Sequence, residues 1–410
     1  MRSWPAPYLP PAPAGVNHPP LRMRDSYSGG YFSLDEAQIN TYICGITPYD
    51  ATHLGHAATY LAFDIAHRYL IAAGSQLNFV ENITDVDDPL LERALRDGQE
   101  WESLAQSQID LFGEDMAALR VIPPSHYRGV VESMAEIIED IEVLVKRGLT
   151  YEILGDIYLD LSQIPGALAE LPLSEVEAIR IFAERGGDPS REGKRHPLDT
   201  LLWQKRKANE PFWNSPFGEG RPGWHIECVS IATRNSMPLV NSCISLQGGG
   251  ADLIFPHHYM TGVQARALTG RKFALGYAHA GMIGLDGEKM SKSKGNLIFV
   301  SKLRSEGVDP MVIRTALLQR HYQSDTMWNT EYLRAAASTI ARIQQNLARE
   351  EVAPASTYVQ SMVESLGRNL DTPMAIAKIL DWCTATESGQ TGGSSGEISR
   401  ALDLYLGIAL

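Results

Sequence analysis

The sequence predicts an α/β fold in which short apolar strands alternate with helices around a parallel sheet. Two stretches carry this pattern, residues 31–120 and residues 222–285. In the first, the apolar segment Ile39–Ile43 is followed by a turn-like loop and a helical run, Ala57–Ala73. A strand, a loop and a helix in this order are typical of a doubly wound nucleotide-binding fold.

The other elements follow in chain order. Leu77–Glu81 predicts a second strand, and one long helical stretch is expected after Asp85. The second α/β stretch predicts a helix from Trp224, a strand at Cys243–Gln247, a helix from His258 and a strand at Ala274–Ile283. The stretch between them, about residues 121–205, is expected to be an insertion. It should hold a helix over Gly129–Arg147, a hairpin around Leu154–Asp156 and a polar loop at Arg185–Arg195.

We therefore expect three parts. Residues 1–30 form a Pro-rich extended segment over the surface, residues 31–300 form the α/β domain with its insertion, and residues 301–410 are helical. Only Ser388–Gly396 is of low complexity, and its Gly and Ser predict a flexible link.

Composition limits the function. The 410 residues are 44% hydrophobic, enough for a large core, and no apolar run is long enough to cross a membrane. Met1–Arg22 holds seven prolines and no apolar h-region, so we expect no secretory signal there, and four cysteines are too few for a disulfide scaffold. We therefore expect a cytoplasmic protein whose cysteines stay reduced.

Charge argues against a nucleic-acid partner. The formal net charge is −13, and residues 331–410 hold six basic and nine acidic side chains with no basic stripe. Nucleic-acid surfaces are usually basic. We expect a monomer that binds small molecules and neither nucleic acid nor membrane.

Two short segments carry the chemistry. His53-Leu54-Gly55-His56 opens the first long helix, where free backbone N–H groups and the helix dipole favour an anion. Gly55 would let a nucleotide base approach the backbone, since it has no Cβ. Lys289-Met290-Ser291-Lys292-Ser293 lies between Gly287 and Gly295, and lysines on such a loop can neutralise a departing pyrophosphate.

In this order and spacing the two segments resemble the nucleotide-binding signatures of class I aminoacyl-tRNA synthetases. The resemblance implies a Rossmann-type class I synthetase catalytic domain with an inserted segment and a C-terminal helical bundle. It also implies that ATP, with Mg²⁺, is a co-substrate, and that four residues stabilise charge on the triphosphate: His53, His56, Lys289 and Lys292.

Three more segments, Cys44–Thr47, Gly223–Cys228 and Gly248–His258, are similar to the cysteinyl-tRNA synthetase branch. There two cysteines and the first histidine of a pair bind zinc, which implies Cys44, Cys228 and His257 here. The position four residues after His257 holds Thr261, a poor zinc ligand, where those relatives have a glutamate. This leaves His258, water or a substrate thiolate as the fourth ligand. Zinc holds a thiolate better than an alcohol and could select cysteine over serine.

Cys44–Tyr60, Glu184–Pro189 and Lys194–Trp203 fit a sister family better, the cysteine:glucosaminyl-inositol ligases of mycothiol biosynthesis. That resemblance implies L-cysteine, ATP and glucosaminyl-inositol as substrates, with a cysteinyl-adenylate intermediate. The Glu184–Pro189 loop is either a solvated turn or part of the acceptor site.

The resemblance also implies how the adenylate is held. Gly250–Asp252 would bind the ribose, Ile283 would pack on the adenine edge, and Trp224 would either wall the cysteine pocket or belong to the core. The full set of expected binding residues is Cys44, Gly45, Ile46, Thr47, Gly55, Thr59, Asn82, Ile83, Thr84, Trp224, Gly250, Ala251, Asp252 and Ile283.

Two alternatives remain open from the sequence. A cysteinyl-tRNA synthetase with a reduced C-terminal region would need a basic tRNA-contact surface and an anticodon module. A non-catalytic zinc- or nucleotide-binding module would have broken signatures, yet both histidines and both lysines are present.

Overall fold

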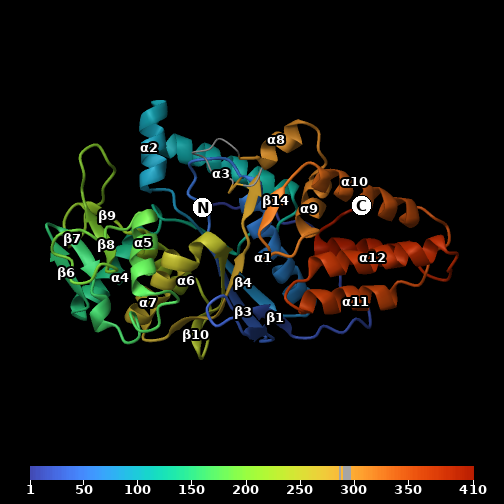
Figure 1. Ribbon diagram of the computed structural model, residues 1–410, viewed down its shortest axis with the longest axis horizontal. Coiled ribbons are helices and arrows are strands. Elements are labelled where there is room, and N and C mark those ends of the chain that lie inside the picture. The colour runs from blue at the N-terminus through green and yellow to red at the C-terminus, as the bar shows by residue number, and fades with distance from the viewer. Residues whose placement is uncertain (286–287, 290–296) are drawn as a thin grey trace.

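The computed structural model describes residues 1–285, 288–289 and 297–410. At its centre lies a parallel five-stranded sheet in the order β11-β10-β3-β4-β5 (Figure 1). Its strands are β3 (Gln38–Ile43), β4 (Gln76–Ile83), β5 (His126–Gly129), β10 (Ser242–Gly250) and β11 (Lys272–Ala280). The predicted α/β class and the four predicted strands of this sheet are confirmed, although three of them are longer than expected.

Helices connect these strands. The predicted crossover is α1 (Leu54–Ala72), while the single long helix expected after Asp85 is wrong: the chain forms α2 (Asp88–Asp97) and α3 (Trp101–Ala118). Gly98 causes the break, because it takes a left-handed conformation (φ 64°). Its N–H donates to the carbonyls of Ala94 and Leu95 and so caps the end of α2. In the second α/β stretch, α6 (Trp224–Arg234) and α7 (Tyr259–Thr269) follow the predictions, with a short turn, η3 (Ile254–His258), before α7.

The edge strand β5 differs from the sequence expectation. It pairs with β4 in the central sheet, so that Val80 lies opposite His126, although these residues were expected in the insertion. The helix expected over Gly129–Arg147 correspondingly begins later, as α4 (Met134–Lys146). The four residues of β5, His126–Gly129, show no alternation of apolar and polar side chains, so the sequence gives no strand pattern there. Pairing with β4 decides their conformation.

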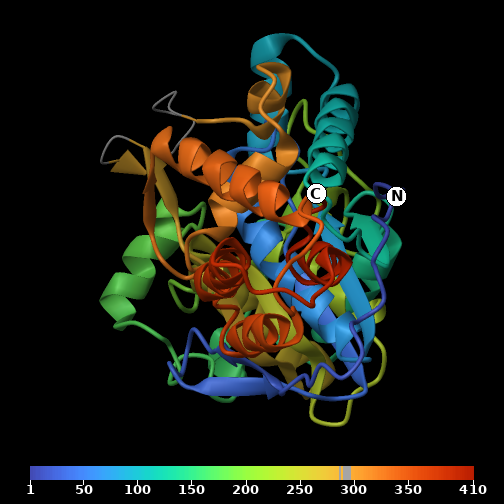
Figure 2. The same ribbon diagram turned by 90° about the vertical axis from the view of Figure 1, so that its right-hand side faces the viewer.

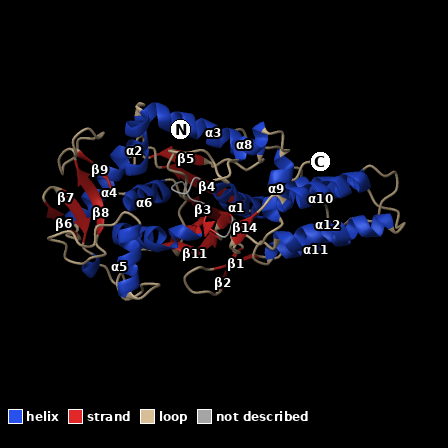
Figure 3. Cartoon of the chain, turned by 45° about the horizontal axis from the view of Figure 1, so that its top comes forward, coloured by secondary structure: helices blue, strands red, loops and turns tan. Residues whose placement is uncertain are grey.

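The insertion carries its own antiparallel sheet, which stands apart from the central one (Figure 3). The predicted hairpin is confirmed as its first pair, and the polar loop Arg185–Arg195 lies against this sheet. Asp188 of that loop accepts hydrogen bonds from Tyr158 and, at 3.0 Å, from Lys194, which stabilise the loop. The elements are β6 (Thr150–Ile153), β7 (Asp156–Leu159), η1 (Leu161–Gln163), α5 (Glu175–Glu184), β8 (Thr200–Lys205) and β9 (Gly220–Pro222).

The C-terminal part is mainly helical, as predicted, and its long helices lie together on the right-hand side of Figure 1, the side that faces the viewer in Figure 2. A small sheet, β13-β12-β14, joins it to the α/β domain. The elements are β12 (Ile283–Leu285), β13 (Glu288–Lys289), α8 (Val300–Ser305), α9 (Pro310–Leu318), β14 (Thr326–Trp328), α10 (Glu331–Leu347), α11 (Ser356–Gly367), α12 (Thr372–Glu387), α13 (Ser395–Ala401) and η5 (Leu402–Leu406).

The N-terminal segment is extended, as expected, and leads into a hairpin of β1 (Leu21–Arg24) and β2 (Tyr31–Leu34). It is nevertheless anchored in the core. Trp4 is only 6% exposed, its indole N–H donates to the carbonyl of Val121 at 2.8 Å, and its ring meets Phe112 and Tyr127 edge-on.

A buried ion pair ties the C-terminal part to α1. Asp64 on α1 binds Arg68 at 2.7 Å and also Arg314 of α9, and all three side chains are shielded from solvent. The guanidinium of Arg314 also donates to the carbonyls of Leu119 and Leu406. Burial alone would raise the pKa of Asp64, but the charges of the two arginines outweigh burial and lower this pKa.

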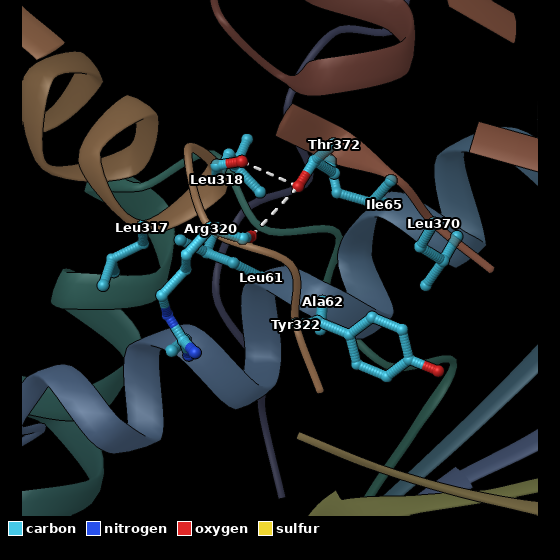
Figure 4. A pocket seen from close by; sticks show the side chains of 10 residues that line it. Leu61, Ala62, Ile65, Leu317, Leu318, Arg320, Tyr322, Leu370 and Thr372 are labelled. Atoms are coloured by element: carbon cyan, nitrogen blue, oxygen red, sulfur yellow. Dashed lines mark hydrogen bonds between the residues drawn. The ribbon is translucent and has the colours of Figure 1, made fainter. Parts of the chain in front are cut away.

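The same junction is closed by apolar side chains (Figure 4). Thr372 donates to the carbonyl of Leu318 and also reaches that of Arg320, while Leu61, Ile65 and nearby side chains fill the space over α1. Within the described ranges, the helices are all too short or too polar to form a membrane span.

We expect Asp64→Ala to lower the free energy of unfolding by about 3–5 kcal/mol, because it leaves two buried guanidinium groups without their carboxylate. Urea denaturation at pH 7 measures the change. Since folding lowers the pKa of Asp64, its contribution is present at neutral pH and is lost as the pH falls through the folded-state pKa. Asp381→Ala, which removes an exposed carboxylate, is the matched control and should change stability by less than about 0.5 kcal/mol. An equal effect of the two variants would contradict the assigned role.

Candidate active site

A cavity of about 350 Å³ opens at the carboxyl edge of the central sheet, beside the start of α1. Most of the expected binding residues border it. The predicted members of its wall are Cys44, Gly45, Ile46, Thr47, His53, Gly55, His56, Thr59, Trp224, Gly250, Asp252 and Ile283. Residues that the sequence did not single out complete it: Tyr49, Asp50, Tyr60, Leu253, Ala280, Gly281, Met282 and Leu297.

The two histidines of the first signature stack at the amino end of α1. Their ring centroids are 3.8 Å apart, and Nδ1 of His53 caps the helix by accepting from the N–H of Gly55 at 3.0 Å. A Cβ at Gly55 would lie 2.8 Å from Cε1 of His53. The structural reason for Gly55 is therefore the folded-back imidazole of His53, in addition to the expected approach of a nucleotide.

Burial lowers the pKa of His56 to about 4, so its imidazole is neutral at pH 7. This neutral side chain can donate a hydrogen bond to a phosphate but carries no charge. The attraction for an anion at this end of the cavity therefore comes from the α1 dipole and from N–H donors.

The chain segment after the second signature runs beside the first. The N–H of Leu54 donates to the carbonyl of Ile298, and the N–H of Val300 donates to that of Thr52, both at 2.9 Å. The backbone of Lys289 pairs with Gly284 in the β12–β13 hairpin. Lys292 lies outside the described residues.

Two cysteines and two histidines meet at the other end of the cavity. Sγ of Cys228 lies 3.3 Å from Nε2 of His257, and Sγ of Cys44 lies 3.1 Å from Nε2 of His258. Ligand atoms of Cys44, His257 and His258 all lie within 4.8 Å of one another. The structure thus groups two of the expected metal ligands, Cys44 and His257, with His258, and it places the third, Cys228, against His257.

Further polar side chains surround this cluster. His225 lies with its Nδ1 2.9 Å from Nδ1 of His257, and Gln247 donates to Cys44 at 3.5 Å. Burial lowers the pKa of His257, keeping the imidazole neutral, and raises the pKa of the Cys228 thiol. Neutral imidazoles are good ligands, and a bound cation would favour the thiolates. The donor set suits a borderline-soft metal ion.

Thr261, which replaces a possible fourth ligand, is fully buried and donates to the carbonyl of His257 at 2.6 Å. It therefore stabilises the turn that presents His257. His225 and Gln247 were not found from the sequence. Isolated polar residues give no periodic signal, although His225 lies within the Gly223–Cys228 motif.

Asn82–Thr84, which are expected to hold the adenylate, do not border the cavity directly. These residues are 0–2% exposed and are absent from the described wall of the cavity. The Asn82 side chain accepts from Tyr42 and from the N–H of Gly45, and donates to Thr84. Asn82 thus positions the loop that carries Cys44.

Of the segment expected to bind the ribose, Gly250 and Asp252 border the cavity, while Ala251 is not part of the described wall. Gly248–Gly250 forms the end of β10. Trp224 lines the cavity, and its ring stacks on that of His257 with centroids 3.9 Å apart, so it lies at the end of the cavity that holds the cysteine–histidine cluster.

Comparisons with known proteins agree with this geometry. The family described as tRNA synthetases class I (C) catalytic domain matches residues 31–338. A protein of Streptomyces griseus named L-cysteine:1D-myo-inositol 2-amino-2-deoxy-alpha-D-glucopyranoside ligase is 48% identical, over the full length of both chains. A protein of the same name from Geodermatophilus obscurus is also 48% identical, over 100% of this chain and 99% of that one.

Solved structures show the same fold at low sequence identity. Methionyl-tRNA synthetase of Mycobacterium tuberculosis, in complex with methionyl-adenylate, has a TM-score of 0.62 at 16% identity and covers 90% of this chain and 88% of its own. A leucyl-tRNA synthetase of Agrobacterium radiobacter in a ternary complex has a TM-score of 0.59 at 11% identity, covering 90% of this chain and 82% of that one.

Proposed function

This chain belongs to the class I tRNA synthetase (C) catalytic-domain family and, within it, to the L-cysteine:1D-myo-inositol 2-amino-2-deoxy-alpha-D-glucopyranoside ligases; from this we propose how its site performs an ATP-dependent ligation. The single observation that carries the proposal is that the two ends of the cavity differ in their chemistry. One end is a helix amino terminus suited to phosphates, and the other is a thiol–imidazole cluster suited to a substrate thiol.

In the first half-reaction, the carboxylate of cysteine attacks the α-phosphate of ATP. A new C–O–P linkage forms, and pyrophosphate leaves with the electron pair of the broken P–O bond. His53 and His56 at the start of α1, with Lys289 and Lys292, stabilise the charge that develops on the phosphates. Asp252 and Gly250 hold the ribose, and Ile283 contacts the adenine.

Zinc held by Cys44, Cys228 and His257 would bind the substrate thiolate and so discriminate cysteine from serine. The protein orients this thiol with Trp224, which stacks on His257 beside the cavity. His225 positions His257 from its other ring nitrogen.

In the second half-reaction, the 2-amino group of the sugar attacks the acyl carbonyl of the cysteinyl-adenylate. An amide bond forms, the acyl–phosphate ester bond breaks, and AMP leaves. No covalent enzyme intermediate is needed, because the adenylate is already the activated acyl group.

The C-terminal part supports a small-molecule acceptor. Several of its basic side chains are engaged by acidic neighbours: Arg342 pairs with Glu387, Lys378 with Asp381 and Arg334 with Glu331. An acidic helical region with paired cations is a poor surface for an RNA backbone. We propose a cytoplasmic monomer that acts without a nucleic-acid partner.

The acceptor can be tested directly. The purified protein, given ATP, radiolabelled cysteine, glucosaminyl-inositol and total tRNA together, should form the cysteinyl amino sugar and leave the tRNA unlabelled. Thin-layer chromatography and acid precipitation measure the two products. Label on tRNA without any cysteinyl amino sugar would instead identify a cysteinyl-tRNA synthetase.

Metal analysis tests the zinc site. The purified protein should contain about one zinc per chain, and Cys228→Ala should lose both the metal and cysteine-dependent ATP–pyrophosphate exchange. Cys243→Ala is the matched control, because Cys243 is buried beside Thr269 and away from the cluster. Full zinc content in the Cys228 variant would exclude the proposed ligand set.

The nucleotide signatures can be tested by substitution. His53→Asn should keep the helix cap, since Asn caps well, yet lower ATP–pyrophosphate exchange by about 10²–10³-fold through loss of the imidazole. Lys292→Ala should also lower ATP–pyrophosphate exchange. Lys302→Ala, an exposed lysine on α8, should exchange like the wild type. Unchanged exchange in both signature variants would refute their role.

A further inference from the structure

The last turn of α3 carries a buried carboxylate that holds α8, the first helix of the C-terminal part. Asp115 is 0% exposed, and its Oδ1 lies 2.6 Å from Nη1 of Arg304. Its second oxygen, Oδ2, is also buried and has no hydrogen-bond partner among the described residues. Because a buried carboxylate is costly without a partner, the contact with Arg304 fixes α8 to α3.

Helix α8 is short and depends on such outside contacts. It has six residues, and the residue before it, Phe299, provides no side-chain cap. Val300, Leu303 and Arg304 are three and four residues apart and therefore share one face of the helix. Val300 and Leu303 pack in the main core, while Arg304 extends this face to α3, beside which α8 lies (Figure 1).

The start of α8 also holds the backbone of the first nucleotide signature. Residues 52–54 pair antiparallel with residues 298–300, so that Phe299 lies opposite His53. Leu297, the residue before this pairing, borders the cavity, as does His53. A shift of α8 would therefore move the His53 backbone and with it the imidazole that caps α1.

The end of α3 is itself firmly held. The carbonyl of Leu119, one turn after Asp115, accepts a hydrogen bond from Arg314 of α9 at 2.6 Å. The same guanidinium binds the buried Asp64 of α1. The end of α3 thus gives α8 a fixed point of attachment that is connected to the body of α1.

We propose that Asp115 and Arg304 are positioning residues for the formation of the adenylate. Their ion pair fixes α8, and the backbone pairing at its start transmits this position to His53. Neither side chain belongs to the described wall of the cavity, so the pair acts through the backbone and not through contact with a substrate. This inference rests on the proposed function, because it concerns the first half-reaction.

Cysteine-dependent ATP–pyrophosphate exchange tests the role of Arg304. The active sites are counted as the cysteinyl-adenylate that each chain forms from radiolabelled cysteine with pyrophosphatase present. Arg304→Ala should lower kcat per active site by about tenfold to a hundredfold, since a displacement of about 1 Å can cost this much. The KM for cysteine should stay within about threefold, because the thiol binds at the other end of the cavity. Arg304→Lys should restore kcat to within about threefold, since the contact with Asp115 is a single N–O pair.

A double-mutant cycle tests whether the two residues act together. Asp115→Asn should lower kcat per active site as Arg304→Ala does, and the double variant should show no further loss. The matched control is Asp160→Asn. Asp160 is 2% exposed and pairs with Arg195 at 2.8 Å in the insertion, away from α8, so kcat per active site should stay at the wild-type value.

The outcomes separate positioning from stability. If Arg304→Ala forms fewer active sites but each turns over at the wild-type rate, the ion pair only stabilises the fold and the positioning role is wrong. Additive losses in the double variant would also overturn it. If the wild type shows no cysteine-dependent exchange, the proposed function itself fails.

Discussion

The active site depends on one topological constraint, the reversal of strand order between β3 and β10. From β3 the chain crosses over to β4 on one side, and from β10 it crosses to β11 on the other. A crevice must therefore open between the carboxyl ends of these two central strands. The N–H of Cys44 donates to the carbonyl of Gly248 at 3.2 Å and holds the strands together just before they part. Cys44, Gly250 and Asp252 consequently border the same cavity.

Elements outside the central sheet complete this crevice. The chain returns from the insertion through β9 into α6, which contributes Trp224 and Cys228. From the other side, the C-terminal part supports the part of the cavity wall that holds Gly281 and Ile283. The N–H of Gly281 donates to the carbonyl of Tyr322 at 2.7 Å, and β14 pairs with β12. The C-terminal part thus supports this wall through backbone pairing, and the buried Asp64 ion pairs secure it to α1.

The sequence predicted those parts of the site that local chemistry determines. Glycines and histidines at strand ends and helix starts stand out in a linear pattern, so Gly55, His53 and His257 could be named. The contact between the side-chain amide of Asn82 and the N–H of Gly45 was not predicted, because only the folded chain brings these two residues together. Strand β5 and the proximity of His258 to Cys44 could not be predicted, because both depend on tertiary packing, which leaves no periodic pattern in the sequence. The α2–α3 break could have been predicted from Gly98.

Local fields inside the cavity explain how an acidic protein with a net charge of −13 could bind a phosphate-containing ligand. At the amino end of α1, where we propose that the triphosphate of ATP binds, the helix dipole and neutral imidazoles such as His56 act over short distances. Asp50 and Asp252 also border the cavity, and their carboxylates would repel phosphate. Since the screening length in physiological salt is only about 8 Å, these local fields outweigh the distant surface charge. An acidic protein can therefore still offer an anionic substrate a favourable local field at a helix amino terminus.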